Sequence, residues 1–382
     1  MNETTVSTDY STADTLYLAF ELSQEKWKLG FTCGVGQPVW KRVVPGGDVL
    51  ALGKQIRLAK ERFGLSENCR VVSCYEAGRD GFWLHRYLLV NRIENRVVDS
   101  ASIEVNRRAK RAKTDRLDVE KLVTMLVRFE AGEQKVWSVV HVPSPEVEDE
   151  RHLHRELHTL KGDRTRHINR IKGLLAGQGV RMPVQADFLS SLDEVRMWDG
   201  CRLPAGLRAR LEQEYACLTF VHEQILAREA ERREMLRTSQ DASVAKVRQL
   251  LRLRGIGENS AWLFVMEFFG WRDFRNRRQV GALAGLAPTP YQSGDEWHEL
   301  GISKAGNRPL RGMAIEIAWS WLRYQPDSAL SRWYQDRFGH GSKRMRKIGI
   351  VALARKLLIA LWRYLEFGEI PAGAQFKAQL EA

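Results

Sequence analysis

The first hundred residues contain short apolar or alternating segments separated by polar breaks, a pattern typical of β-strands. A segment with apolar residues at helical spacing follows the third of them, and helix and strand then alternate. This order predicts an α/β domain with a mixed sheet. The predicted elements are strands at 16–21, 27–32, 39–44, 70–75 and 96–99, and helices at 49–63 and 81–90.

Beyond Pro143 the apolar residues change to the four- and three-residue spacing of long helices that pack in pairs. The spacing recurs in two arms, and a stretch containing Gly and Pro at 177–204 joins them. The pattern predicts an antiparallel helical hairpin or coiled coil, an element that serves dimerisation or bridges nucleic acids. Its apolar positions are Leu153, Leu157, Leu160, Ile171 and Leu174 in the first arm, and Leu207, Leu211, Leu218, Val221 and Ile225 in the second.

A third region begins near Val244, and its first feature is a helix, a glycine turn and a second helix at 250–261. This is the helix-hairpin-helix pattern, in which the glycines let the backbone approach a phosphate. Such a turn can also be a simple connection between helices, but nearby arginines favour the phosphate interpretation. Four tryptophans lie among helical apolar residues and are expected in the core: Trp319, Trp321, Trp333 and Trp362.

These changes of pattern divide the 382-residue chain into four parts. We expect a disordered N-terminus at 1–15, an α/β domain at 16–142, a helical coiled-coil region at 143–242 and a mainly α-helical C-terminal domain at 243–382. The N-terminus is polar and mildly acidic, unlike a signal peptide. The longest apolar stretch, 348–362, is interrupted by Arg355 and Lys356, so we expect no membrane span.

The charge and the cysteines of the chain bear on its partner and its compartment. Lys and Arg number 60 against 47 Asp and Glu, a formal net charge of +13. The excess is clustered as well as high and favours a nucleic acid as partner, with ordinary basic solubility as the alternative. The five cysteines include no C-x-x-C pair, which predicts free thiols in a cytoplasm, without a zinc ribbon or a disulfide framework.

Four acidic residues stand where predicted strands end or a predicted helix begins. Glu21 ends the first strand, Glu76 follows the fourth, and Asp115 and Asp118 share one face of a helix predicted at 115–128. Sites in open α/β sheets form at the carboxyl ends of strands. Clustered carboxylates repel one another unless a divalent cation neutralises them, and such a cation assists phosphodiester chemistry. The sequence therefore predicts a Mg²⁺ (or Mn²⁺) site, although Asp at a helix start is also a good cap.

A second group of candidate residues is basic and includes one serine. We interpret the cations at 107–116, next to the two aspartates, as a track for a phosphate backbone, although a charge run is usually a solvated face. Ser293 lies in a Pro-flanked loop, as either a turn residue or a nucleophile whose oxyanion nearby cations steady. The candidate nucleic-acid-binding residues are Arg107, Arg108, Lys110, Arg111, Lys113, Arg252, Arg254, Lys304, Arg308 and Arg311.

Two further groupings are weaker candidates. His154 and His158 are four residues apart and could bind a metal, but their polar, His-rich helix makes a solvated surface the better prediction. Ser293, Asp295 and His298 have the composition of a catalytic triad, but triads assemble in space and not locally in sequence.

Blocks spread along almost the whole chain match a known family in order and spacing. In these blocks the chain resembles the DEDD transposases of the insertion-sequence family one-hundred-and-ten, which are related to the Piv and MooV recombinases. The family's first acidic position is normally Asp, whereas this chain has Glu21. The matching blocks lie at 18–23, 75–78, 113–118, 254–257, 285–288, 293–294, 301–307 and 352–357.

The resemblance implies an N-terminal RuvC-like (RNase H) domain, a coiled-coil insert and a C-terminal transposase domain. It implies that Glu21, Glu76, Asp115 and Asp118 take the four metal-ligand positions and that Ser293 takes the nucleophile position. It also implies recombination of double-stranded donor and target DNA through a covalent phosphoserine intermediate, with Mg²⁺ assisting and a structured bridge RNA choosing both DNAs. A homodimer or tetramer that acts in the cytoplasm at the bacterial nucleoid is expected.

The departure at the first acidic position keeps two alternatives open. The extra methylene of Glu21 moves its carboxylate by about a bond length, and Mg²⁺ demands near-ideal octahedral geometry. One alternative is a RuvC-like nuclease that hydrolyses junctions with metal-activated water and uses Ser293 only as a turn residue. The other is an inactive derivative that binds nucleic acid without cutting it.

Overall fold

The structure is a computed structural model that describes residues 15–78, 81–103, 115–293, 296–304 and 306–378. Side chains at 101, 115–118, 290–293 and 296–300 lie outside this description. The chain divides into two compact units, Met1–Val142 and Pro143–Ala382, each described separately below.

The N-terminal unit is built on a mixed sheet of five strands with the order β3-β2-β1-β4-β5. β1, β2 and β3 run antiparallel to their neighbours, whereas β1, β4 and β5 are parallel. The predicted α/β layout with a mixed sheet is thus confirmed. The strands are β1 (Thr15–Leu22), β2 (Lys26–Thr32), β3 (Trp40–Pro45), β4 (Arg70–Glu76) and β5 (Glu94–Val98).

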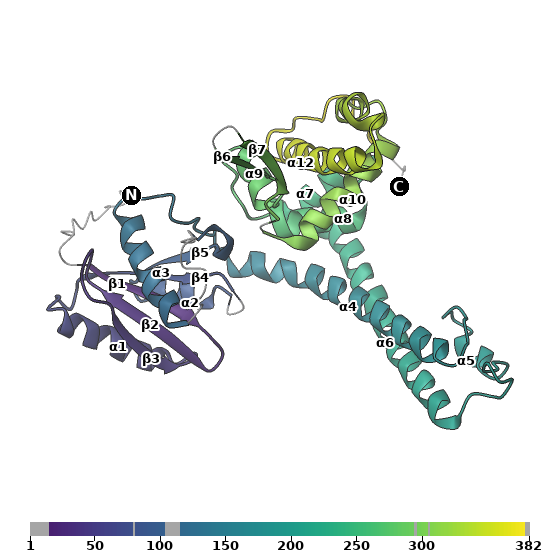
Figure 1. The fold of residues 1–382 in the computed structure, drawn as a ribbon, viewed down its shortest axis with the longest axis horizontal. Coiled ribbons are helices and arrows are strands. Elements are labelled where there is room, and N and C mark those ends of the chain that lie inside the picture. The colour runs from purple at the N-terminus through teal and green to yellow at the C-terminus, as the bar shows by residue number, and fades with distance from the viewer. Residues whose placement is uncertain (1–14, 79–80, 104–114, 294–295, 305, 379–382) are drawn as a thin grey trace. The chain divides into compact units, whose positions relative to one another are not determined.

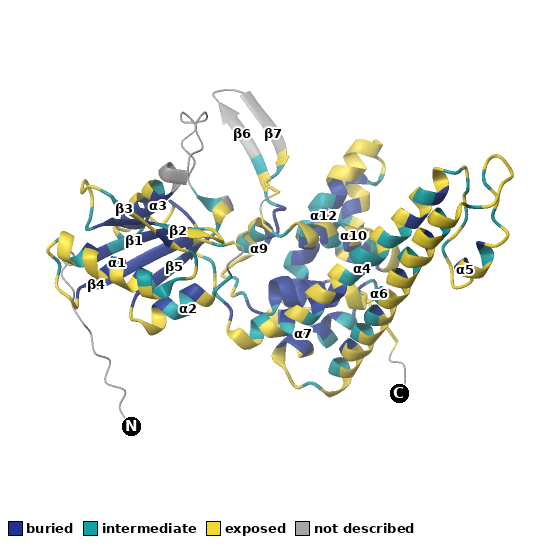
Figure 2. Cartoon of the chain, turned by 90° about the horizontal axis from the view of Figure 1, so that it is seen from below, coloured by how far each residue is buried: buried dark blue, intermediate teal, exposed yellow. Residues whose placement is uncertain are grey.

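Three helices cover the two faces of this sheet. α1 (Val49–Arg62) and α2 (Trp83–Val90) pack on one face, where Leu18 and Phe20 are fully buried. α3 (Asp115–Glu130) packs on the other, against Ala19 and neighbouring apolar side chains of β4. The side chains of successive strand residues point to opposite faces, so β1 contributes to both cores. Figure 2 colours much of this sheet as buried.

Two long helices begin the C-terminal unit, α4 (Pro145–Ala176) and α6 (Ala205–Thr238), joined through the short α5 (Phe188–Ser191). Ser144 caps α4 by accepting a hydrogen bond from the Val147 amide. The helices lie side by side in opposite directions (Figure 1). Their cross-helix ion pairs, His167–Glu214 at 2.7 Å and Lys161–Glu229 at 2.7 Å, follow this antiparallel register. The predicted helical hairpin is therefore present.

The rest of this unit is a helical body with one small sheet. Its apolar core is formed mainly by α8, η4, α10 and α12, with Trp262 and Trp321 fully buried. The predominance of helix agrees with the sequence prediction, but the hairpin β6–β7 was not expected. The elements are α7 (Ala242–Leu251), α8 (Glu258–Phe264), η4 (Val265–Phe269), α9 (Arg277–Leu283), β6 (Pro288–Ser293), β7 (Glu296–Ile302), α10 (Arg308–Tyr324), α11 (Ala329–Tyr334), η5 (Gln335–Gly339) and α12 (Lys343–Phe367).

The four tryptophans expected in this core divide into two pairs. Trp321 and Trp362 are buried as predicted. Trp319 is 47% exposed, and Trp333 only borders the core, so the prediction is wrong for Trp319 and holds only in part for Trp333. Helical periodicity assigns a residue to a stripe but does not tell how far a neighbouring element covers that stripe. Here α11 is short, and one side of Trp333 faces a groove.

Candidate active site and nucleic-acid interface

Glu21 and Glu76 stand at the same edge of the five-stranded sheet. β1 and β4 are parallel neighbours, and Phe20 pairs with Tyr75, so the next residue along each strand is a glutamate. Ala19 and Cys74, two residues earlier, both pack in the core under α3. Because the side chains alternate, Glu21 and Glu76 lie on the α3 face as well.

The direction of α3 brings the two aspartates toward this edge. Near its C-terminal end Glu130 binds Arg70, the first residue of β4, at 2.9 Å. Further back, the Leu122 carbonyl accepts a hydrogen bond from the Cys74 thiol at 3.8 Å. α3 therefore runs antiparallel to β4, and its first turn, with Asp115 and Asp118, points toward the edge where β4 ends. The side chains of both aspartates lie outside the described part.

The two edges of the sheet differ in how their carboxylates are neutralised. At the edge where β4 and β5 begin, Arg70 binds Glu94 at 2.7 Å, and this hydrogen bond lowers the pKa of Glu94. At the opposite edge Glu21 lies 3.5 Å from Lys28, and exposed Glu76 forms no ion pair with a described residue. Among described side chains, no three potential ligands gather in one place, since two of the four candidates are outside the description. The backbone arrangement of all four nevertheless fits a cation site.

Ser293 is the last residue of β6 and pairs with Glu296 of β7. The sequence predicted a Pro-flanked loop here, and the structure has a strand. Pro290 is accommodated because the register shifts between Pro288 and Pro290, and irregular pairing is where a strand tolerates proline. The side chain of Ser293 lies outside the described part.

The base of this hairpin is fixed to the helical body by backbone contacts. The amide of Lys304 donates to the Gly285 carbonyl at 3.1 Å, and that of Ser303 donates to the Ala287 carbonyl at 2.9 Å. Gly306 has a φ of +78°, and a Cβ there would lie 2.2 Å from the Leu283 carbonyl oxygen. Only glycine fits this turn, so Gly306 allows the close packing of the turn against α9.

The helix–turn–helix around Gly255 is present, and its glycine has a structural reason. Gly255 has a φ of +85°, and a Cβ there would lie 3.5 Å from a backbone oxygen of α10. The two arginines before it are exposed, and both contact the C-terminal segment. Arg252 lies 5.0 Å from the ring centre of Phe376, and Arg254 donates to Gln375 at 2.7 Å.

The other predicted nucleic-acid-binding residues fall in two groups. Lys304 and Arg308 are exposed beside the turn before α10, and Arg311 is half-buried. The remaining candidates lie outside the described residues, and these are Arg107, Arg108, Lys110, Arg111 and Lys113.

His154 is buried and not solvated, which corrects the sequence prediction. It is 6% exposed, and its Nδ1 accepts a hydrogen bond from Arg232 of α6 at 2.5 Å. Burial, together with the charge of Arg232, lowers the pKa of His154 to about 4, so the imidazole is neutral and its other nitrogen carries the proton. The polar residues around His154 in the sequence indicated a solvated helix face. α6 packs against one side of α4, and His154 lies on that side.

A buried carboxylate ties the same end of the helical hairpin to the body. Glu267 of η4 accepts hydrogen bonds from Arg151 at 2.9 Å and from Arg155 at 2.8 Å, both on α4. Burial alone raises the pKa of Glu267, but the hydrogen bond from Arg155 and the charge of Arg151 outweigh it and lower the pKa to about 2. The neutral His154 and the ionised Glu267 thus form one buried polar cluster.

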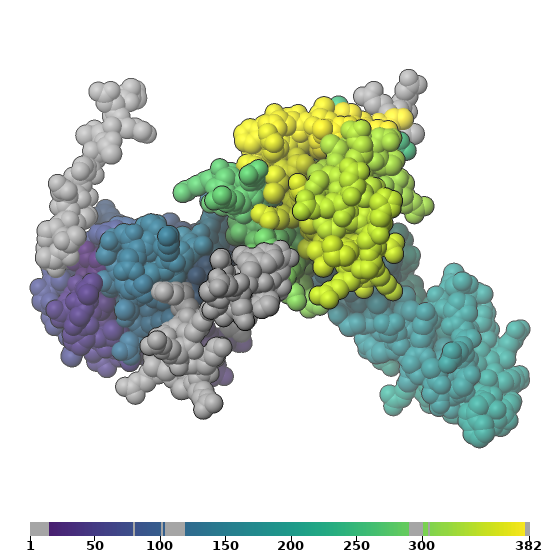
Figure 3. Space-filling view, turned by 45° about the horizontal axis from the view of Figure 1, so that its top comes forward, coloured from purple at the N-terminus to yellow at the C-terminus, as the bar shows by residue number. Residues whose placement is uncertain are grey.

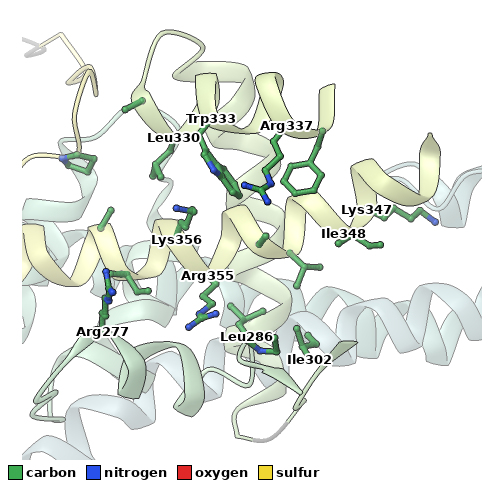
Figure 4. Close-up of a pocket in the computed structure, with 18 of the residues that line it drawn as sticks. Arg277, Leu286, Ile302, Leu330, Trp333, Arg337, Lys347, Ile348, Arg355 and Lys356 are labelled. Atoms are coloured by element: carbon green, nitrogen blue, oxygen red, sulfur yellow. The ribbon is translucent and has the colours of Figure 1, made fainter. Parts of the chain in front are cut away.

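A strongly basic surface of the C-terminal unit was not found from the sequence. It is a cavity of about 1620 Å³ along one face of α12, which we call the basic groove (Figure 4). Among the described residues that line it, Glu369 is the one carboxylate, and it pairs with Arg363 at 2.5 Å. The cations that line the groove are Arg277, Arg278, Arg337, Lys343, Arg344, Lys347, Arg355, Lys356 and Arg363.

One signal for the groove is present in the sequence of α12. Its groove-lining cations recur at spacings of three, four, seven or eight residues, as at Lys343, Lys347 and Arg355, which is the period of one helix face. In the same helix the apolar stretch 348–362 is the feature that stands out in the sequence. No helix in the described part combines the length and the apolar character needed to cross a membrane.

Comparison with known proteins gives consistent results along the chain. Residues 247–334 match the family described as "Transposase IS116/IS110/IS902 family". The chain is 42% identical over 377 residues to "Putative transposase y4rJ" of Sinorhizobium fredii, covering 95% of this chain and 94% of the relative. It is 28% identical over 232 residues to the "Transposase for insertion sequence element IS1328" of Yersinia enterocolitica, covering 58% and 65% of the two chains.

A further relative is the "Transposase for insertion sequence element IS1111A" of Coxiella burnetii. It is 27% identical over 256 residues, which are 66% of this chain and 66% of the relative. The likeness to y4rJ extends over both compact units, so it includes the sheet edge as well as the basic groove. The chain belongs to the IS116/IS110/IS902 family of transposases.

Proposed function

We propose that this transposase is a Mg²⁺-dependent DNA recombinase that uses Ser293 as its nucleophile. The observation that carries the proposal is the convergence of Glu21, Glu76 and the first turn of α3 at one edge of a mixed sheet. Such an edge is where α/β enzymes place their sites. The arrangement also supports a RuvC-like character for the N-terminal unit.

The donor set is suitable for a hard divalent cation. Glu21, Glu76, Asp115 and Asp118 offer carboxylate oxygens, which Mg²⁺ and Mn²⁺ prefer, and the arginines that neutralise Glu94 lie at the other edge. When bound, the cation polarises a phosphodiester and stabilises the charge on the oxygens around phosphorus. Lys28, 3.5 Å from Glu21, would have to share that carboxylate with the cation.

The covalent step proceeds by exchange of phosphoryl oxygens. The Ser293 hydroxyl oxygen attacks phosphorus, an O–P bond forms to the serine, and the bond from phosphorus to a deoxyribose oxygen breaks. The leaving oxygen takes up a proton, and the serine proton passes to the surroundings. A hydroxyl of another strand then attacks the phosphoserine, restores a phosphodiester and frees the serine, so the number of phosphodiester bonds is conserved.

We further propose double-stranded donor and target DNA as substrates and a structured bridge RNA as the guide that selects them. The net charge of +13 suits two polyanionic partners. A homodimer or tetramer supplies the two or more serines that exchange of several strands requires. These elements rest on the resemblance described above together with the charge.

The test is the covalent adduct. The purified protein is incubated with Mg²⁺, the non-coding RNA that flanks its element and end-labelled donor DNA, and the products are separated on a denaturing gel. We expect labelled DNA attached to protein, lost in Ser293→Ala and in Asp118→Ala. Ser303→Ala, which removes an exposed hydroxyl just after the same hairpin, is the matched control and keeps the adduct.

Two other outcomes would replace the proposal. Free cleaved strands without any adduct, equally in Ser293→Ala, would make the protein a metal-dependent junction nuclease. Binding without metal-dependent cleavage would make it an inactive derivative. In that case Glu21→Asp, which restores the acidic residue usual in the family, is the next variant to test.

A further inference from the structure

The basic groove combines a one-sided charge with an apolar floor. Eight of its nine cations are exposed, and Arg363 alone is ion-paired among the residues that the structure describes. Leu286, Ile302 and Ile348 lie between the cations (Figure 4). A surface whose cations lack acidic partners attracts a polyanion.

The length of the groove fits a chain and not a small molecule. Its lining follows α12 from Lys343 to Arg363, which is about 30 Å of helix. In the space-filling view the residues near the C-terminal end of the colour scale, which include α11 and α12, lie next to one another on one face (Figure 3). Phosphates of a strand lying along this face would meet cations on α12 from one end to the other.

An aromatic ring stands in the wall of the groove. Trp333 of α11 is half-buried, and the ammonium of Lys356 lies 4.5 Å from its ring centre. Arg355 is held against α9, because a Cβ on Gly281 would lie 2.8 Å from its Nε, and that Nε has no hydrogen-bond partner among the described residues. The groove therefore has a partly exposed indole, with Lys356 over one face and Phe338 edge-on at 5.6 Å, and a donor held in place beside it.

These features favour binding of a single strand over binding of a duplex. A B-form duplex presents phosphates and sugars outward, and an apolar floor would desolvate phosphates without replacing their hydrogen bonds. A single strand can turn its bases toward apolar and aromatic side chains while its phosphates meet the cations at the rim. Pro288 and Ile302 also line the groove, and they form the base of the hairpin whose first strand ends in Ser293.

We propose that the basic groove binds a single-stranded nucleic acid segment, with Trp333 as a base-stacking face. The role of this binding rests on the proposed function. That role is to hold an unpaired DNA or RNA segment near the Ser293 hairpin. The binding itself is independent of that chemistry.

The test measures the affinity of the full-length protein for fluorescent 20-nucleotide single strands, oligo-dT and oligo-U, in EDTA so that no strand transfer occurs. The groove variant is Arg344→Ala/Lys347→Ala. The matched control is Arg332→Ala/Arg346→Ala, which removes two exposed cations of α11 and α12 that do not line the groove. A 20-base-pair duplex and polyglutamate serve as alternative probes.

We expect the groove variant to lose at least tenfold in affinity for single strands, with a salt slope lower by about 0.7 per removed charge. The control variant is expected to stay within about threefold. Trp333→Leu should weaken single-strand binding several-fold and leave polyglutamate binding unchanged, because stacking requires the ring. Oligo-dT and oligo-U then report which nucleic acid the groove prefers.

Three results would overturn the proposal: an equal loss in both double variants, a duplex affinity that falls as much as the single-strand affinity, or no effect of Trp333→Leu on single strands. Melting curves are recorded to verify that each variant is folded. The two double variants change exposed cations only, so their affinities do not depend on repacking around Trp333. Ser293→Ala is run in parallel. It must keep the affinity and lose the adduct, so a failure of the groove proposal is separable from a failure of the recombinase proposal.

Discussion

The acidic edge of the N-terminal unit and the basic groove of the C-terminal unit gather charge in opposite ways. In the proposed cation site, Glu21 and Glu76 come from the ends of two adjacent strands, and Asp115 and Asp118 belong to the first turn of α3. The groove is lined by nine cations, which belong to α9, η5 and α12. A cation site needs a few ligands at fixed places, which a sheet edge supplies, whereas a polyanion site needs many charges along a length.

Loss of a carboxylate at the edge is the largest effect we predict. Glu76→Gln should lower Mg²⁺-dependent strand cleavage on the order of a thousandfold, because a cation ligand stabilises charge that develops in the transition state. Binding of single strands in EDTA should not change. The measurement is the cleavage rate on donor DNA, and Glu120→Gln, which removes an exposed carboxylate of α3, is the control. If Glu76→Gln cuts normally, the acidic edge is not the active site.

The comparison also explains which site could be predicted from sequence. Glu21 and Glu76 lie at the carboxyl ends of strands whose apolar pattern is clear, and parallel neighbours bring such ends together. The groove depends on how α9, α11 and the C-terminal segment pack around α12, which no local pattern encodes. The prediction that His154 is solvated was wrong for the same reason. The helix that buries it is α6, whose Arg232 is 78 residues away in sequence. Helix and strand positions follow local periodicity, and burial of a polar side chain follows tertiary packing.

The second largest effect we predict is on stability, at the turn beneath the Ser293 hairpin. Gly306→Ala forces a left-handed residue and places a methyl 2.2 Å from the Leu283 carbonyl, so we expect a loss of about 3 kcal/mol in unfolding free energy. Gly312→Ala is the control, because Gly312 is an exposed position of α10 and a Cβ there meets nothing within 4 Å. The check is urea unfolding of both variants. Equal unfolding free energies of the two variants would show that the turn accommodates the added methyl group and does not fix the hairpin.

Acid should weaken the C-terminal unit through its buried polar cluster. The pKa of His154 is lowered to about 4, so the unfolded chain binds a proton more readily and stability falls as the pH drops from about 6.5 to 4. Glu267, with a pKa of about 2, adds a second loss that begins near pH 4.5. We expect about 2 kcal/mol between pH 7 and pH 4.5. His154→Gln keeps an acceptor for Arg232 and should flatten the curve between pH 7 and 5.

The His154→Gln variant is needed to assign this pH dependence to the C-terminal unit, because burial also lowers the pKa of His85 in the N-terminal unit. The check is urea unfolding at a series of pH values, followed by the fluorescence of the tryptophans in the C-terminal core. A wild-type curve that is flat from pH 7 to 5, or a His154→Gln curve that falls equally, would contradict a buried neutral imidazole.

The smallest effect we predict concerns the contact that holds α3 over the sheet. A Cβ on Gly30 of β2 would lie 2.7 Å from Cγ1 of Val119, the residue after Asp118. Gly30→Ala should therefore push the first turns of α3 outward, at about 1 kcal/mol in unfolding free energy. If the aspartates of that turn hold the cation, cleavage should fall about tenfold, because a shift of about 1 Å in a positioned group is costly. Gly53→Ala, whose Cβ meets nothing within 4 Å in α1, should be neutral or slightly stabilising.

A second substitution decides whether the position of α3 is the cause. Val119→Ala removes the methyl groups that the new alanine would meet, so the double variant Gly30→Ala/Val119→Ala should recover cleavage relative to Gly30→Ala, even though the smaller core side chain costs stability on its own. The coupling between the two changes is read from the four cleavage rates of a double-mutant cycle. Additive losses would mean that the gap between β2 and α3 does not govern the acidic edge. Recovery would tie the chemistry of the sheet edge to a single close contact, whereas no contact of that kind is expected to govern binding in the groove.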